Sequence, residues 1–193
     1  MKPLTAKDLF TLEQYAINRL EFRARVLAHK RDRQVPIGPN ATLYFEDALT
    51  IQYQVQEMLR VERVFEPEGI REELDSYNPL IPDGSNLKAT FMLEYPDIEE
   101  RRQALAKLMN IAERVWLKVD DYEVVRPVAD EDIERETEDK TSSVHFLRFE
   151  LLPDMVRALK SGAPLAIGID HPNYRYQVDV PENVRRSLAG DLD

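Results

Sequence analysis

The hydrophobic pattern of this chain changes at about residue 87, and this change limits the possible folds more than any other feature. Before it, residues 9–33 contain neither glycine nor proline and repeat apolar side chains every three or four positions, as an amphipathic helix does. After it, short segments of strand type alternate with helical ones. We therefore expect an α+β protein, with a helical region at 1–86 and a sheet-forming region at 87–193 packed as one unit.

The first helix carries two separate apolar lines. The line that we expect to be its buried stripe comprises Ile17, Leu20, Ala24 and Leu27. The second line comprises Tyr15, Phe22 and Val26. Two lines predict a helix covered on two sides, which indicates a contact with a partner or with a second subunit.

A second long helix is expected from Asp47, as its cap, to Phe65. A short strand at Ala41–Phe45 precedes it, and a short helix at Ile70–Tyr77 follows it. Its expected buried stripe comprises Ile51, Val55, Met58 and Phe65. We expect the two long helices to pack together, against the sheet or against a second subunit.

The second region contains a weak internal repeat of the type β-α-β-β. The first unit has strands at Leu87–Tyr95, Arg114–Val119 and Tyr122–Val128, with a helix at Asp97–Met109. The second unit has strands at Val144–Leu151, Pro164–Ile169 and Tyr174–Val180, with a helix at Pro153–Lys160, and a terminal helix follows. The repeat predicts a mixed, mainly antiparallel sheet with helices on one face.

Composition excludes several classes of function. The chain has 193 residues, no cysteine, and 26 Lys and Arg against 36 Asp and Glu, so its formal charge is 26 − 36 = −10. Without a thiol it has no iron–sulfur cluster of its own, no Cys-ligated zinc and no cysteine nucleophile. The negative charge argues against general nucleic-acid binding. The apolar runs are too short to span a membrane and the start lacks a signal peptide, so we expect a cytoplasmic protein.

Charge is distributed unevenly along the chain. The segment Arg19–Arg33 has a net charge of +4, and the segment Asp130–Asp139 has a net charge of −6. Such runs are most often solvated faces. Two alternatives stay open for the acidic segment, which are a docking site for the basic helix end, in the same chain or in a second copy, and a cation site.

Three histidines are the main candidates for chemistry, because the standard nucleotide, hydrolase and metalloprotease motifs are absent. His29 reads as a helix-terminal residue. His145 shares a strand face with core residues, which is typical of a buried, hydrogen-bonded histidine. His171 follows Asp170 at a strand end. A His- and carboxylate-bound divalent metal would use the candidate ligands His145, Glu150, Asp170 and His171.

A polar loop before residue 87 is the second candidate site. Its small residues permit a turn with exposed backbone N–H groups, which can hold an anion. The candidate ligand-binding residues are Tyr77, Asn78, Asp83, Ser85 and Asn86. An ordinary turn that leads into the following strand is the alternative.

Several sequence stretches are similar to a bacterial family known as domain of unknown function 3501. These stretches include Gly69–Thr90, Phe45–Asp47, Tyr53–Met58, Lys140–Thr141, His145–Glu150 and Gly168–His171, and the similarity covers nearly the whole chain. The family has no assigned activity. The resemblance implies genes beside rubrerythrin-like proteins and iron–sulfur oxidoreductases, and therefore an accessory role in peroxide or electron-transfer defence.

Three functions are consistent with these observations. The first is a non-catalytic accessory or binding protein that docks a redox protein partner, or a second copy as a homo-oligomer, through the N-terminal helices. The second is a metal-assisted, hydrolase-like enzyme that uses His145, Asp170 and His171, with Glu150 or Asp83 nearby. The third is a sensor of small anions or nucleotides at the loop Asp83–Asn86.

Overall fold

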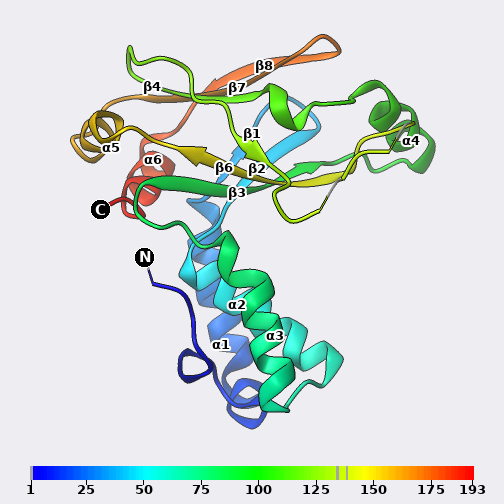
Figure 1. Cartoon of the computed structure of the whole chain (residues 1–193), viewed down its shortest axis with the longest axis vertical. Helices are drawn as coiled ribbons and strands as arrows, with labels where there is room; N and C mark the ends of the chain where they lie inside the picture. Colours follow the sequence, from blue (N-terminus) through cyan, green and yellow to red (C-terminus); the bar gives the residue numbers. More distant parts are fainter. Residues whose placement is uncertain (1, 134, 138) are drawn as a thin grey trace.

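The computed structural model of the chain describes residues 2–133, 135–137 and 139–193. Three helices form a stalk, and two sheets with three further helices form a sheet region above it (Figure 1). The stalk helices are α1 (Leu12–Arg31), α2 (Ala48–Glu62) and α3 (Pro67–Tyr77). The other helices are α4 (Ile98–Lys107), α5 (Pro153–Lys160) and α6 (Glu182–Ala189). The strands are β1 (Gln34–Pro36), β2 (Ala41–Phe45), β3 (Asn86–Leu93), β4 (Val115–Val119), β5 (Val128–Ala129), β6 (Val144–Glu150), β7 (Leu165–His171) and β8 (Tyr174–Asp179).

The strands form two antiparallel sheets instead of the single mixed sheet that the pattern predicts. One has the order β1-β2-β3-β6-β5 and the other the order β4-β7-β8. Equivalent strands of the two repeat units pair with each other, β3 with β6 and β4 with β7. Helices α4 and α5 carry the chain from the first sheet to the second in each unit. The α+β class is confirmed.

The strand expected at Tyr122–Val128 is wrong. Asp120 adopts a left-handed conformation with a φ angle of 45° and turns the chain. Val125 then makes only an isolated bridge to Leu117, while Val128–Ala129 forms β5 at the edge of the other sheet. The pattern also misses β1, which pairs with β2 and so brings residues before 87 into the five-stranded sheet.

The main hydrophobic core lies between the two sheets and is lined at its ends by α4, α5 and α6. Leu43, Phe91 and Phe149 point into it from the five-stranded sheet, and Leu117 and Ile167 point into it from the three-stranded sheet, all of them fully buried. Because side chains alternate along a strand, the other face of the five-stranded sheet is turned toward the stalk. This outer face is only partly buried.

The stalk buries the second apolar line of α1 and exposes the first. Tyr15, Phe22 and Val26 pack with residues of α2, whereas Ile17 and Leu20 are 81% and 83% exposed. Within this chain, therefore, only the second line of α1 is covered, and cover of the first line by a partner stays a prediction. Helix α2 starts at its expected cap, Asp47, but ends at Glu62. Phe65 lies beyond it and is exposed, contrary to the prediction.

Among the described residues, no helix is both long enough and apolar enough to cross a bilayer.

Candidate functional site

His145 is a buried and fully hydrogen-bonded side chain. Its Nδ1 lies 2.6 Å from a carboxylate oxygen of Asp130, and its Nε2 lies 3.0 Å from the Thr141 hydroxyl and 3.1 Å from the Ser142 carbonyl. The backbone of Asp130 is left-handed (φ 51°), and the carboxylate of Asp130 also accepts a hydrogen bond from the Phe146 amide. With both ring nitrogens occupied, His145 has no lone pair to give to a metal.

The other candidate metal ligands have separate partners. The Asn173 amide donates to Nδ1 of His171, and Nε2 of His171 donates to the Met109 carbonyl. Asp170 forms a two-point ion pair with Arg126, which holds the pKa of Asp170 below its usual value.

Glu150 pairs with Arg148 and accepts a hydrogen bond from Asn86. Within the described residues no three His, Asp or Glu side chains gather as metal ligands do. The four candidates therefore do not form the expected site, because each is already used by a neighbour.

The loop Asp83–Asn86 is also occupied by its own contacts. The Asp83 carboxylate accepts the Ser85 amide and hydroxyl, and the Asn86 side chain accepts the Asp83 amide. Gly84, with a φ angle of 104°, lies against the carboxylate of Asp193. An acidic group already stands where an anion would have to bind, so the loop reads as a turn that seats the last residues of the chain.

Tyr77 and Asn78 serve two different purposes. The Asn78 side chain donates to the Leu4 carbonyl and accepts the Leu4 amide, and it thereby ties the N-terminal segment to the end of α3. Tyr77, the last residue of α3, lines a groove that is described below. Of the five candidate ligand-binding residues, only Tyr77 is in a position to meet a ligand in that groove.

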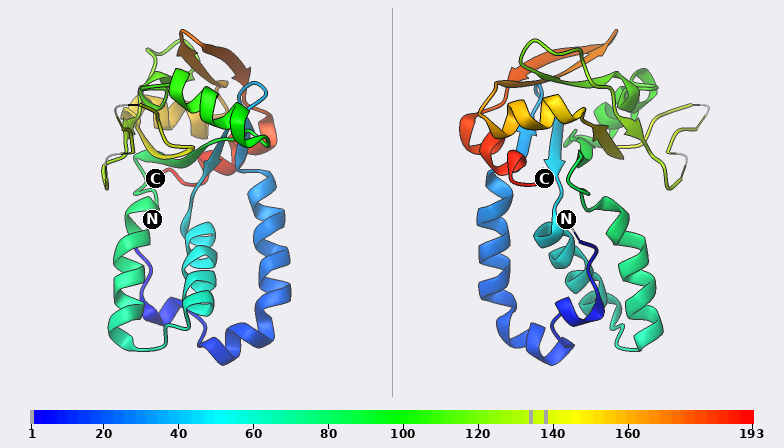
Figure 2. Two further views of the ribbon diagram at one scale, coloured as in Figure 1. Left: turned by 90° about the vertical axis from the view of Figure 1, so that its right-hand side faces the viewer. Right: turned by 60° about the vertical axis from the view of Figure 1, so that its left-hand side comes forward.

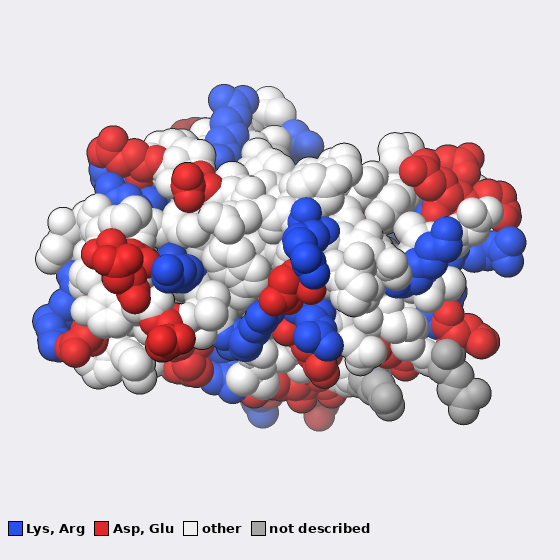
Figure 3. Space-filling view, turned by 90° about the horizontal axis from the view of Figure 1, so that it is seen from above, with Lys and Arg blue, Asp and Glu red and all other residues white. Residues whose placement is uncertain are grey.

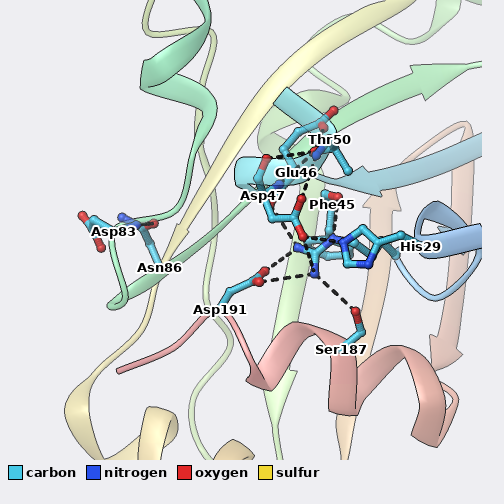
Figure 4. A network of polar contacts seen from close by, with 10 residues as sticks. His29, Phe45, Glu46, Asp47, Thr50, Asp83, Asn86, Ser187 and Asp191 are labelled. Carbon is cyan, nitrogen blue, oxygen red and sulfur yellow. Dashed lines mark hydrogen bonds and ion pairs between the residues drawn. The ribbon is translucent and has the colours of Figure 1, made fainter. Parts of the chain in front are cut away.

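A buried ion-pair network joins the stalk to the sheet region, and the sequence pattern misses it (Figure 4). Arg33 is 2% exposed and follows α1. Its guanidinium pairs with Asp191 after α6, lies 3.5 Å from Asp47 at the start of α2, and donates to the carbonyls of Phe45 and Glu46. His29 adds a 2.5 Å contact to Asp47. We call these side chains the Arg33 network.

The two carboxylates of the Arg33 network differ in their acidity. Burial alone would raise the pKa of Asp47, but Arg33, the Thr50 amide and His29 hold the pKa of Asp47 below its usual value. Burial raises the pKa of Asp191, in spite of its ion pair with Arg33. Arg33, Asp47 and Asp191 are buried and serve to fix geometry, whereas His29, at the edge of the network, is partly exposed.

A groove separates the stalk from the outer face of the five-stranded sheet. It consists of two cavities of about 490 Å³ and about 450 Å³ that share Tyr77, Leu80 and Phe146. The cross-strand row Tyr44–Thr90–Phe146 forms its floor, since these residues are direct neighbours on the outer face. Its wall is largely apolar. The aliphatic part of the lining comprises Leu27, Ile51, Leu80, Met92 and Val144.

The charged groups of the groove lie mostly at its two ends. At one end Lys30 and Arg31 of α1 form the rim, and neither makes an ion pair within the described residues. At the other end Arg148 pairs with Glu131, and Lys88 donates to the Pro79 carbonyl. Burial lowers the pKa of Lys88.

Inside the groove, the Glu46 carboxylate accepts both Thr50 and Thr90 hydroxyls at 2.6 and 2.7 Å. Because two hydroxyl groups already satisfy it, Glu46 is part of the wall. The groove therefore offers a largely apolar interior with one carboxylate, Glu46, in its wall, and one end at which Lys30 and Arg31 make no ion pair within the described residues.

Within the described residues, the acidic segment Asp130–Asp139 makes no ion pair with the basic end of α1 of the same chain. Three of its described acids form ion pairs elsewhere, Asp130 and Asp132 with Arg135, and Glu131 with Arg148. Glu134 and Glu138 lie outside the described residues. Acidic and basic side chains are also intermingled over the face seen from above (Figure 3). The basic end of α1 is divided, since Arg33 is buried whereas Arg31 is exposed.

Comparison with known proteins places the chain in a family. The model of a family described as "Protein of unknown function (DUF3501)" matches residues 3–192. The chain belongs to the DUF3501 family. A protein of unknown function from Burkholderia pseudomallei K96243, whose crystal structure is known, is 54% identical to this chain in sequence. The two structures superpose with a TM-score of 0.95 over the full length of both chains. No curated protein sequence matches this DUF3501 chain.

Proposed function

We propose that this DUF3501 protein is a non-catalytic binding protein and that its ligand lies in the groove between the stalk and the five-stranded sheet. The observation that carries the proposal is the groove itself. Cavities of a few hundred Å³ that are lined mainly by apolar and aromatic side chains, with a few polar groups, are typical of ligand sites. The two cavities here meet at Tyr77, Leu80 and Phe146.

The contacts of the polar side chains support binding over catalysis. An acid–base or metal-assisted reaction needs a histidine or carboxylate that is free to meet the substrate. His145 and His171 are buried and use both ring nitrogens on protein partners. Glu46, the acid within the groove, is held by two hydroxyls.

The charges select the class of ligand. The interior of the groove favours an apolar body, and the rim at Lys30 and Arg31 favours an anionic group. We therefore propose an amphipathic small molecule with a carboxylate or a similar anion at one end. An apolar chain would lie along the floor formed by Thr90 and Phe146, with its anion toward α1.

Decanoate is a suitable probe, with decanol as its uncharged analogue. We expect decanoate to raise the melting temperature of the protein and to bind at a one-to-one ratio in titration calorimetry. Decanol should bind at least about tenfold more weakly, because it lacks the charge that faces Lys30 and Arg31. Equal binding of both probes, or binding of neither, would contradict the proposal.

Three variants locate the probe. Leu80→Trp places a large ring where the two cavities meet and should abolish binding. Lys30→Glu reverses a charge at the rim and should weaken decanoate binding by about tenfold without changing decanol binding. Arg175→Glu makes the same charge change on the exposed strand β8 and serves as the matched control. Retention of full affinity in Leu80→Trp would place the ligand elsewhere.

A binding protein of this kind is compatible with the accessory role that the family resemblance implies. Because the chain contains no cysteine, we propose that any iron–sulfur or thiol centre in such a system belongs to the partner. A cytoplasmic location stays a prediction of the sequence.

A further inference from the structure

The outer side of α1 is an apolar surface without a partner in this chain. We call Ile17, Leu20, Ala24 and Leu27 the outer stripe, and all four are exposed, Ile17 and Leu20 by more than four fifths. The opposite side of the helix carries Tyr15, Phe22 and Val26 and packs with α2. Helix α1 runs along the edge of the stalk (Figure 2), and of the outer stripe only the last residue, Leu27, also borders the groove.

The spacing of the outer stripe is that of a helix–helix seam. Its residues follow one another in steps of three, four and three, which is the a/d pattern of a coiled coil. Single exposed apolar residues are common on protein surfaces, but a row of four along one helix face is not explained in that way. The surface that fits such a row best is another helix with the same row.

The charges at the two ends of the outer stripe indicate the direction of that second helix. Glu13 lies in line with the stripe at its start and Arg31 lies in line with it at its end, and both are exposed. With Glu13 and Arg31 added at its ends, the outer stripe has steps of four, three, four, three and four residues. This spacing is the same in both directions along the helix.

Two antiparallel copies would therefore pair residue with residue. Glu13 would lie opposite Arg31, Ile17 opposite Leu27, and Leu20 opposite Ala24. A parallel pair would instead place Glu13 against Glu13 and Arg31 against Arg31, which is unfavourable. The self-complementary order of the charges selects a second copy of this chain as the partner.

We propose that two copies of this protein associate through their α1 helices, antiparallel, along the outer stripe. A helix of 20 residues is about 30 Å long, so one pair of helices gives a small interface. Interfaces below roughly 1,200 Å² are typical of weak complexes, and the dimer is accordingly concentration-dependent. Glu21 and Arg23 flank the stripe and remain solvated at the edges of the contact.

The dimer would also bring the partner close to the groove. Leu27 of the outer stripe and Arg31 at its end also line the groove. Antiparallel pairing sets the start of the partner's α1 beside this rim. The proposal does not depend on a ligand in the groove, because it concerns the protein alone.

Sedimentation equilibrium of the full chain tests the proposal. The average mass should rise from 22.5 kDa toward about twice that value as the concentration increases from about 1 to 300 μM. Leu20→Glu buries a charge at the centre of the seam and should leave only monomer. Asn18→Glu adds the same charge to α1 off the stripe, on another exposed side, and should leave the dimer unchanged.

A charge exchange tests the direction of the helices. Glu13→Arg and Arg31→Glu should each weaken the dimer by about five- to tenfold, since each places like charges together at both ends. The double variant should return to within about twofold of the native affinity.

Three results would overturn the proposal. They are a monomer at every concentration, a dimer that survives Leu20→Glu, and single charge variants that the double variant does not rescue. Circular dichroism of each variant establishes that the exposed substitutions leave the fold intact.

Discussion

The sheet region and the stalk bury their apolar side chains to very different degrees. The core between the two sheets draws on both sheets and on α4, α5 and α6, and its central residues are essentially inaccessible to solvent. The stalk has two small clusters and leaves Ile17, Leu20, Val61 and Phe65 exposed. The sheet region therefore has one large core and the stalk only small clusters, although the sheet region also leaves single apolar side chains exposed, such as Ile98 and Leu152.

The Arg33 network joins these two regions. It connects the end of α1 and the start of α2, in the stalk, with the residues after α6 in the sheet region. The groove lies along this same junction. We therefore expect these buried charges to help to hold the groove walls in position.

The largest expected losses of stability come from substitutions in the main core and in the aromatic cluster of the stalk, and they allow a direct comparison of the two. Phe149→Ala removes a fully buried ring from the main core and should lower the free energy of unfolding by about 4–5 kcal/mol. Phe22→Ala removes a ring from the aromatic cluster of the stalk and should cost less, about 3 kcal/mol, because a cluster at the edge relaxes more easily. Urea denaturation measures both values. A larger loss for Phe22→Ala would reverse the comparison.

The next effect concerns the junction. Arg33→Met keeps the unbranched, apolar part of the side chain but leaves the carboxylates of Asp47 and Asp191 buried without the guanidinium, and it should cost about 3–4 kcal/mol. Arg175→Met, on the exposed strand β8, is the matched control and should change stability by less than about 0.5 kcal/mol. We also expect ligand affinity in the groove to fall in Arg33→Met. Urea denaturation tests stability, and an equal effect of the two variants would show that the junction is not held by these charges.

Most regular elements could be predicted from the sequence because their signals are local. Ala41–Phe45 and Pro153–Lys160 have the bounds expected, and Asp47 caps α2 as predicted. The faces of α1 could not be predicted in the same way. Two apolar lines of similar strength lie on opposite sides of this helix, and only the position of α2 determines which one is buried.

The site was less predictable than the fold, for a physical reason. His145, His171 and Asp170 were reasonable candidates by residue type, but their partners, such as Asp130 and Met109, are distant in sequence. Arg33 could not be recognised either, because it looks like one more cation in a basic helix end. The groove arises where the stalk lies against a sheet face, so no local sequence pattern marks it. Of the candidate ligand-binding residues, only Tyr77 lines it.

The pH dependence of the stalk gives a smaller effect. Glu57 of α2 accepts hydrogen bonds from Arg19 and Tyr15 of α1. The bond from Arg19 is the main cause that lowers the pKa of Glu57 from 4.5 to about 2. A folded-state pKa below the unfolded value gives stability that is present above about pH 4.5 and is lost as the pH falls toward 2.

Glu57→Gln tests this link between α1 and α2. At pH 7 the variant should be less stable than the native protein by about 2 kcal/mol, because it loses charge-assisted bonds. The difference should shrink steadily between pH 5 and pH 2, where the native carboxylate becomes protonated. Denaturation curves over this pH range measure it. A difference that stays constant would mean that the charge of Glu57 contributes nothing.

The smallest effect, at Ile17, has a sign that depends on protein concentration. In dilute solution Ile17→Gln should be neutral or stabilising by up to about 0.3 kcal/mol, because the side chain is 81% exposed and glutamine favours the helix slightly more than a β-branched residue. In concentrated solution the native protein gains stability from pairing of α1, by mass action, and the variant does not. Melting curves at two concentrations therefore give opposite orders of stability if the outer stripe is an interface. The same order at both concentrations would mean that the exposed side of the stalk is simply solvated, and the stalk would then differ from the sheet region only in the size of its core.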